Sequence, residues 1–206
     1  MRSFIFFLSF VISIHCFSQF GLQAGLTQSN NTIKSFLPTN ELKVNLGIHF
    51  STFLLSKIND NIKVKSELNI YQSGYTGETS GYDSNYNYTV KYNFIGLSGK
   101  LFFGITKKWH IAPGIGYHYI LSGNSIHEYN DKITHYSINP YSDMFLDRFI
   151  LNGSINICYI IEKNWFIDLE YKRNIATGRL QFNNSEKYNV LKLGVGFYFQ
   201  HKKIRI

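Results

Sequence analysis

The sequence predicts an all-β protein that folds as an eight-stranded, up-and-down antiparallel barrel. Aromatic residues make up 17% of the 206 residues and only 3 residues are proline, a usage more typical of strands than of helices. Apolar side chains alternate with small or polar ones in eight segments, and the connections between these segments alternate between long and short. Alternation with a period of two indicates strands whose two faces meet different surroundings.

The first 18 residues are interpreted as a cleaved secretory signal peptide. Arg2 provides a positive charge, an apolar run extends from Phe4 to Cys16, and small residues precede a cut before Gln19. Neither this run nor any later one reaches the roughly 18 apolar residues that a membrane-spanning helix needs. A lipid on Cys16 is the alternative, which the bulky residue in front of it disfavours. Residues 19–206 are therefore expected to form one barrel domain.

The eight expected strands share one pattern, an apolar face opposite a small or polar face. They cover residues 20–28, 43–54, 62–70, 86–103, 109–121, 149–159, 165–172 and 189–199. In the last of them Leu191 and Leu193 lie on one face, and Lys192 and Gly194 lie on the other. In the fourth, the apolar residues move from even to odd positions after Phe94, which we interpret as a β-bulge.

The connections predict how these strands are arranged. Long polar connections cover 29–42, 74–85, 122–148 and 176–187, and short ones cover 56–61, 106–108 and 162–164. Strict alternation places all the long connections at one rim of an up-and-down barrel and all the short ones at the other, as in outer-membrane barrels. The apolar face would then meet lipid, and the small, polar face would line a narrow interior.

Aromatic residues on the apolar face gather at the rim of the short connections. This set contains Phe20, Phe103, Trp109, Tyr159, Trp165 and Phe199. Such placement is expected of an aromatic girdle at a membrane interface. We therefore expect a protein of the outer membrane of a Gram-negative bacterium, with outer-membrane lipid as a partner. The termini, including a short tail at 200–206, would be periplasmic, and the long loops would be extracellular.

The face opposite the apolar one carries a mixed set of titratable residues. This set contains His49, Lys65, Glu67, Lys100, His118, Asp168, Glu170, Lys172 and Lys192. An eight-stranded barrel has an interior narrow enough for its own side chains to fill. We therefore expect a polar network in the lumen, in which opposite charges pair and satisfy one another.

Two other functions fit parts of the pattern. A soluble lipocalin-like barrel would turn the faces inside out and hold an apolar ligand, although the aromatic rim and the glycines of the polar face favour the membrane. An outer-membrane lipid-modifying enzyme would need a serine, a histidine and a carboxylate together, and His118 with Asp168 are the candidates. The sequence contains no motif that would place a serine beside either of them. We expect a non-enzymatic protein with a structural or interaction role in the envelope.

The longest connection, 122–148, contains several side chains of the kinds that bind metals. They are His127, Glu128, Asp131, His135, Asp143 and Asp147. Their spacing matches no zinc or calcium motif, so neither a metal nor a cofactor is expected. The tyrosines of this connection suit recognition of an extracellular protein or sugar.

The formal net charge is +8, and basic residues crowd the short-connection rim and the tail, where they outnumber Asp60 and Glu162. Lys57, Lys107, Lys108 and Lys163 lie in these turns. Such a rim would attract anionic lipid headgroups, at about 1 kcal/mol per residue, or an acidic periplasmic protein. Nucleic acid is not an expected partner, because a secreted barrel does not meet it. The mature chain keeps one cysteine, Cys158, so no intramolecular disulfide can form.

Three stretches carry a resemblance to a known family. The end of the signal peptide, "FSQ", the strand "PGIGYHYILSG" and the closing "LKLGVGFYF" resemble the PorT-type outer-membrane barrels of Bacteroidota. The resemblance implies the eight-stranded barrel and outer-membrane residence, and, for PorT itself, a part in type IX protein secretion. The tail differs, because such barrels usually finish on an aromatic residue whereas "QHKKIRI" follows Phe199 here.

Overall fold

The computed structural model describes residues 19–32, 41–81, 84–129, 132–138, 149–177 and 187–199, which form β-strands and their short turns. No helix in this part of the chain is long and apolar enough to cross a membrane. The expected signal peptide, 1–18, and the expected tail, 200–206, lie outside the described residues.

Ten strands are present in the described residues. They are β1 (Gln19–Thr32), β2 (Glu41–Lys43), β3 (Asn45–Lys57), β4 (Ile62–Gly81), β5 (Ser84–Gly104), β6 (Trp109–Tyr129), β7 (Lys132–Ile138), β8 (Phe149–Ile160), β9 (Trp165–Thr177) and β10 (Lys187–Phe199).

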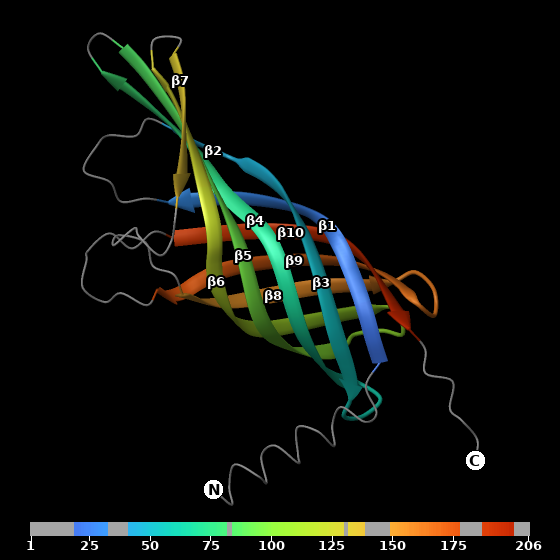
Figure 1. Cartoon of the computed structure of the whole chain (residues 1–206). Helices are drawn as coiled ribbons and strands as arrows, with labels where there is room; N and C mark the ends of the chain where they lie inside the picture. Colours follow the sequence, from blue (N-terminus) through green and yellow to red (C-terminus); the bar gives the residue numbers. More distant parts are fainter. Residues whose placement is uncertain are drawn as a thin grey trace, which may run out of the picture.

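Eight of these strands close into a ring in which all neighbours are antiparallel (Figure 1). The order around the ring is β1, β3, β4, β5, β6, β8, β9 and β10, and β10 pairs with β1 again. The closing pair runs in register from Phe20 opposite Phe199 to Thr32 opposite Lys187. The two additional strands lie beside the ring, because β2 pairs with β4 and β7 pairs with β6. The predicted fold class is confirmed.

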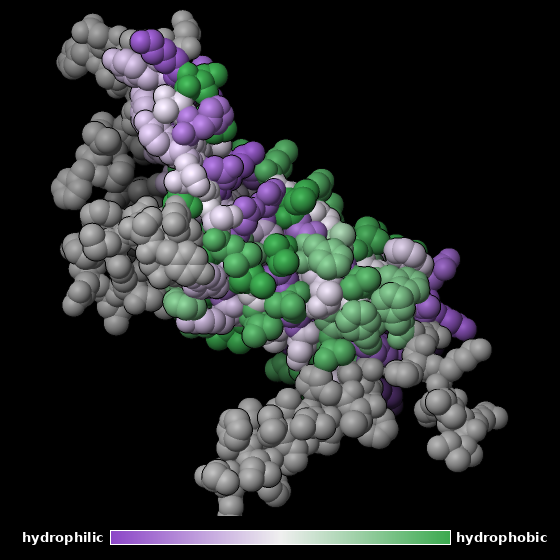
Figure 2. All heavy atoms as spheres, viewed as in Figure 1, coloured by the Kyte–Doolittle hydropathy of each residue, from purple (hydrophilic) through white to green (hydrophobic). Residues whose placement is uncertain are grey.

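Side-chain alternation divides each strand between the outer wall and the interior. In β10, Leu193 is 53% exposed on the outer wall, whereas the neighbouring Lys192 is 1% exposed. Figure 2 shows hydrophobic side chains covering the visible side of the barrel wall. A lipocalin-like barrel would turn such side chains toward its interior, so this orientation favours the membrane interpretation.

Three strands continue well beyond the barrel wall on the side of the long connections. β4, β5 and β6 contain 20, 21 and 21 residues, whereas the other five strands of the ring contain 12 to 14. The far ends of these three strands, together with β2 and β7, form a sheet that we call the projecting sheet (Figure 1).

The projecting sheet corrects most of the predicted loop 74–85 and the part of the predicted loop 122–148 that extends to Ile138. β4 and β5 remain paired as far as Gly81 and Ser84, and β6 continues to Tyr129 before β7 pairs back along it. Both faces of this sheet carry polar residues because it lies beyond the barrel wall. The apolar alternation that marks a half-buried strand is therefore missing there, and the sequence pattern resembles a loop.

The bulge predicted in the segment 86–103 was placed on the wrong strand. β5 pairs with β4 without interruption, and its even-numbered residues face inward on both sides of the phase change. A bulge does occur at this level, but its additional residue is Leu121 in β6. Asn93 pairs with Ser122, and the next residue, Phe94, pairs with Ile120. The apparent phase change has another cause. The inward residues of β5 up to Phe94 are themselves apolar, because they belong to an apolar layer inside the barrel.

Candidate functional site

The residues predicted to form a polar network all face the barrel interior, where none is more than 4% exposed. They are supplied by six strands: His49 by β3, Lys65 and Glu67 by β4, Lys100 by β5, His118 by β6, Asp168, Glu170 and Lys172 by β9, and Lys192 by β10. On β4 and β9 they occupy alternate positions, which places their side chains side by side on the inward face.

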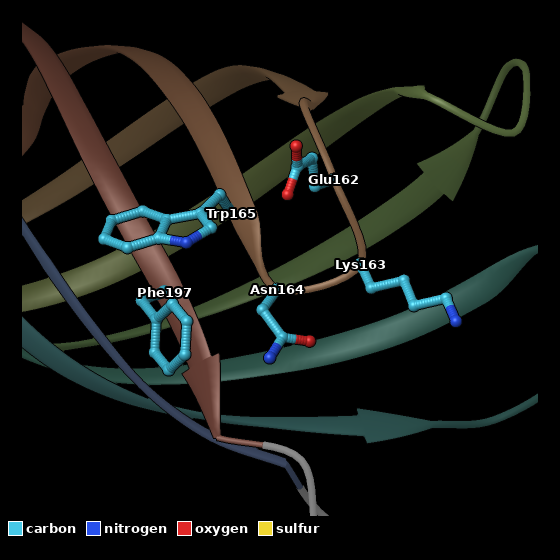
Figure 3. A pocket seen from close by; sticks show the side chains of 5 residues that line it. All are labelled: Glu162, Lys163, Asn164, Trp165 and Phe197. Carbon is cyan, nitrogen blue, oxygen red and sulfur yellow. The ribbon is translucent and has the colours of Figure 1, made fainter.

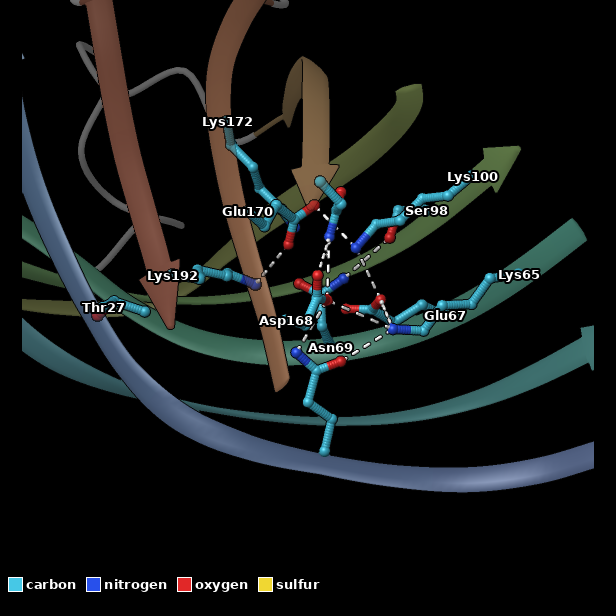
Figure 4. A network of polar contacts seen from close by, with 12 residues as sticks. Thr27, Lys65, Glu67, Asn69, Ser98, Lys100, Asp168, Glu170, Lys172 and Lys192 are labelled. Carbon is cyan, nitrogen blue, oxygen red and sulfur yellow. Dashed lines mark hydrogen bonds and ion pairs between the residues drawn. The ribbon is translucent and has the colours of Figure 1, made fainter. Parts of the chain in front are cut away.

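Two glutamates and one lysine form the centre of this network (Figure 4). The ammonium of Lys100 lies 2.9 Å from Oε2 of Glu67 and 2.8 Å from Oε1 of Glu170. Glu67 also contacts Lys65 at 3.1 Å. The second oxygen of Glu170 lies 3.5 Å from the ammonium of Lys172 and 3.9 Å from that of Lys192. Every lysine of the predicted set therefore has a carboxylate within ion-pair distance.

The third carboxylate, Asp168, is held mainly by neutral amides. Its oxygens accept hydrogen bonds from Nδ2 of Asn156 at 2.9 and 3.0 Å and from Nε2 of Gln23 at 3.1 Å. Gln23 in turn accepts a hydrogen bond of 2.9 Å from Lys65, which lies 3.9 Å from Asp168. Gln23 and Asn156 were not in the predicted set, although both occupy inward positions of their strands.

The two predicted histidines lie beside the ion pairs rather than within them. The ring of His118 packs edge-on against Tyr71, with centroids 5.4 Å apart. The glycine opposite it is required for space, because a Cβ at Gly96 would lie 2.0 Å from Nδ1 of His118. His49 is similarly close to Gly194, whose added Cβ would lie 2.8 Å from Nε2 of the imidazole.

Apolar side chains cover the charged network on both sides along the barrel. The layer toward the short turns contains Phe53, Leu55, Phe102, Ala112, Cys158, Phe166 and Tyr198. The layer toward the long connections contains Tyr71, Tyr75, Val90, Tyr92, Phe94, Ile120, Ile150 and Val190. The charged side chains are thus enclosed between two apolar layers, and the interior is a filled core at these levels.

Sequence reasoning missed both layers, although a signal for them is present. Phe102, Phe166 and Tyr198 each stand between two outward apolar residues, so these strands carry three consecutive apolar residues near the short turns. In a half-buried strand the middle residue of such a run must face the other side. Interruptions of the alternation therefore mark where the interior changes from polar to apolar.

The residues considered for catalysis and metal binding do not assemble a site in the described part of the chain. Asp168 contacts amides and a lysine, and His118 packs against an aromatic ring. Among the described residues no group of three or more His, Cys, Asp or Glu side chains could hold a metal ion. His127 contacts the hydroxyl groups of Tyr86 and Ser125 in the projecting sheet. Asp131, Asp143 and Asp147 lie outside the described residues.

The six aromatic residues predicted to form a girdle lie at or next to strand ends on the side of the short turns. Phe20 stacks on Phe199 with ring centroids 5.6 Å apart, and Trp109 meets Tyr159 at 4.7 Å. Trp165 packs against Phe197 at 4.9 Å, which adds a residue outside the predicted set. Cross-strand pairing of these ends brings the rings together, because β1 pairs with β10 and β6 pairs with β8.

The short turns form a basic rim next to this girdle. Lys57 pairs with Asp60 within its own turn. In the turn between β8 and β9, a shallow depression of about 570 Å³ is lined by Glu162, Lys163, Asn164, Trp165 and Phe197 (Figure 3). The two aromatic rings lie on one side of this depression, and the side chain of Lys163 extends away from them.

Comparison with known proteins identifies the fold. No protein-family model and no curated protein matches the sequence. The chain is similar to the crystal structure of Ail, the attachment invasion locus protein of Yersinia pestis, in complex with the heparin analogue sucrose octasulfate. The TM-score is 0.51 at 14% identity, over 88% of this chain and 99% of that chain. At this identity the likeness shows a shared fold.

Two further solved structures resemble the chain less closely. One is outer membrane protein W of E. coli, with a TM-score of 0.46 at 17% identity over 88% of this chain and 98% of that chain. The other is Neisserial surface protein A, with a TM-score of 0.44 at 12% identity over 87% of this chain and 97% of that chain.

Proposed function

We propose that this chain is a non-enzymatic outer-membrane protein whose barrel anchors the projecting sheet at the cell surface. The observation that carries this proposal is the outer wall, where apolar side chains face away from the barrel between its rims. Leu26 is 62% exposed, Leu97 66% and Leu193 53%. An apolar surface of this extent requires a cover, and the hydrocarbon of a bilayer fits a closed ring of antiparallel strands.

The filled interior supports an anchoring role rather than transport. Ion pairs occupy the middle of the barrel, and the two apolar layers cover them toward both rims. A continuous water-filled path is characteristic of barrels with many more strands. We therefore assign the function to the surfaces at the two rims, which are the projecting sheet outside the cell and the short turns in the periplasm.

The proposed orientation follows from the two rims. Bacterial outer-membrane barrels place short turns in the periplasm and long connections outside. β1 begins and β10 ends at the rim of the short turns, so both termini would be periplasmic. Lys107, Lys108 and Lys163 would then face the anionic headgroups of the inner leaflet or an acidic periplasmic protein.

The projecting sheet is the proposed site for an extracellular partner. Tyr129, Ile133 and Tyr136 are between 49% and 60% exposed on its strands, and His135 lies between the last two. Aromatic side chains with polar neighbours suit binding of a protein or a sugar. Because Ail was crystallised with a sulfated sugar analogue, a sulfated sugar is a reasonable first probe for this sheet.

A narrower proposal comes from the resemblance to PorT-type barrels, which would place the protein in type IX secretion in a member of the Bacteroidota. It rests on the sequence resemblance alone. Deletion of the gene should then abolish export of type IX substrates, with restoration by the intact chain. Normal export in the deletion strain would contradict this role and leave the anchoring function standing.

The membrane proposal is tested by fractionation and by heat modifiability. A closed barrel has no free sheet edge, so the folded protein should remain in the membrane fraction and resist SDS until it is boiled. Boiling should then change its mobility on a gel. Recovery from the aqueous fraction without detergent, with a single mobility, would indicate a soluble barrel.

The orientation is tested by labelling single cysteines in intact cells with a membrane-impermeant maleimide. Lys132→Cys places the thiol on β7, and Lys107→Cys places it in a short turn. The native Cys158 is 1% exposed inside the barrel and serves as the internal negative control. Labelling of the β7 site alone is expected. Labelling of the turn site alone would reverse the orientation.

A further inference from the structure

The charged network inside the barrel contains more positive than negative groups. Four lysines, at positions 65, 100, 172 and 192, meet three carboxylates, at positions 67, 168 and 170. When all of them are ionised, an excess of one positive charge remains. Each of these side chains is at most 3% exposed, so water does not screen that charge from outside. An uncompensated charge at such a depth is strongly unfavourable.

The excess is concentrated on Lys172 and Lys192. Both ammonium groups approach the same oxygen, Oε2 of Glu170, at 3.5 and 3.9 Å. These distances are too long for good hydrogen bonds. The other oxygen of Glu170 is occupied by Lys100 at 2.8 Å. Within the described residues neither of the two ammonium groups has a hydrogen-bond acceptor.

The surroundings of these two lysines offer little other compensation. The ring of Tyr71 faces both, with its centroid 4.3 Å from Nζ of Lys192 and 5.4 Å from Nζ of Lys172. A ring face attracts a cation but neutralises no charge. Both ring nitrogens of His118, which packs against Tyr71, also have no hydrogen-bond partner among the described residues. Among the described residues, several donors therefore gather at this level, and no carboxylate besides Glu170 lies within ion-pair distance of the two lysines.

We propose that the barrel interior binds one small monovalent inorganic anion, of the halide class, between the ammonium groups of Lys172 and Lys192. One negative charge would balance the network, and a halide accepts hydrogen bonds from several directions without a fixed geometry. The filled interior limits the site to a small ion. A water molecule in the same place, or loss of a proton from one of the two lysines, would leave the stability independent of chloride, so both alternatives are distinguishable from a bound anion. The site does not depend on the partner or the membrane orientation proposed above.

The test is reversible unfolding by urea of the purified protein in detergent, in sodium chloride, sodium bromide or sodium gluconate at equal ionic strength. Unfolding releases the ion, so slow exchange in the folded state does not hide its effect. Above the dissociation constant, each tenfold rise in chloride or bromide should raise the folding equilibrium constant about tenfold. Gluconate is too large to enter and should have no such effect. Equal stability in chloride and gluconate would overturn the proposal.

Variants assign the effect to the two lysines. Lys192→Met removes the excess charge and one set of donors, so its stability should no longer depend on chloride. Lys91→Met, at an exposed position of β5, is the matched control and should keep the full dependence. Retention of the dependence in Lys192→Met would refute the site. If this variant does not fold, Lys172→Met takes its place in the urea experiment. Crystals of the unmodified protein grown in bromide should then also show an anomalous peak at the site. Absence of that peak between the two lysines would also refute it.

Discussion

Glu170 and Lys100 form an ion pair of 2.8 Å that crosses the interior of the barrel from β9 to β5. These strands are not neighbours, because β6 and β8 lie between them in the ring. The same ammonium reaches Glu67 on β4 at 2.9 Å, so one lysine joins three strands. A buried charge that loses its partner is costly, and the stability of the barrel should therefore depend on each of these carboxylates.

Replacement of Glu170 by Gln tests this dependence. Glu170→Gln leaves Lys100 with one carboxylate and removes the ion-pair partner of Lys172 and Lys192. Loss of one partner from a buried pair costs about 3 to 5 kcal/mol. We expect a decrease of this size in the free energy of unfolding, measured by urea titration of the protein in lipid vesicles.

The control for this variant is Glu162→Gln. Glu162 lies exposed in the turn between β8 and β9, where a surface substitution changes stability by about 0.5 kcal/mol or less. Equal stability of both variants would show that the interior carboxylate is not needed to balance the lysines.

The second prediction concerns the glycines that make room for interior rings. A Cβ at Gly196 would lie 2.0 Å from Cζ of Phe166, which packs in the apolar layer near the short turns. Overpacking of this kind costs about 1 to 3 kcal/mol, and Gly196→Ala should lower the urea midpoint accordingly. Gly99→Ala is the matched control in a strand, because its Cβ would meet nothing within 4 Å. If both variants unfold at the same midpoint, the interior is looser than the distances indicate.

The third prediction separates the membrane-facing wall from the projecting sheet. Leu193, which is 53% exposed, pairs with Leu26 and Leu169 halfway along the wall. Ile133, on β7, is 60% exposed. An arginine near the bilayer midplane costs about 2 to 4 kcal/mol and one in water costs little, so only Leu193→Arg should impair folding into vesicles. Similar tolerance of both variants would mean that lipid does not cover the wall.

The sequence predicted the wall and the polar interior because two different environments act on alternate residues there. Lys65 and Glu67 lie inward and Leu68 lies outward, as the period of two requires. The nine predicted interior residues could be assigned to one face without knowing which strands meet. Their pairing was not accessible, because it depends on which strands lie opposite one another across the interior. Lys100, for example, pairs with residues from β4 and β9.

The projecting sheet and the two apolar layers of the interior were missed for opposite reasons. In the projecting sheet both faces carry polar residues, so strands such as β7 have no contrast between their faces. At the level of the apolar layers both faces of a strand are apolar, since the lipid-facing residues and the interior residues are both hydrophobic. Phe94 and Ile95 therefore looked like a shift of phase, although β5 continues in register. A period-two pattern reports a strand only where its two sides differ.

The last prediction concerns the end of the barrel. In the described chain the final pair between β1 and β10 joins Phe20 to Phe199, whose rings stack at 5.6 Å, and Phe199 also packs against Phe197 at 5.1 Å. Each aromatic pair contributes about 0.5 to 1.5 kcal/mol beyond its buried area, so Phe199→Ala should reduce the yield of heat-modifiable barrel in the outer membrane. Deletion of residues 200–206 removes none of these contacts and should leave that yield unchanged at equal expression. A deletion that fails to assemble beside a normal Phe199→Ala would show that barrel closure needs residues beyond Phe199.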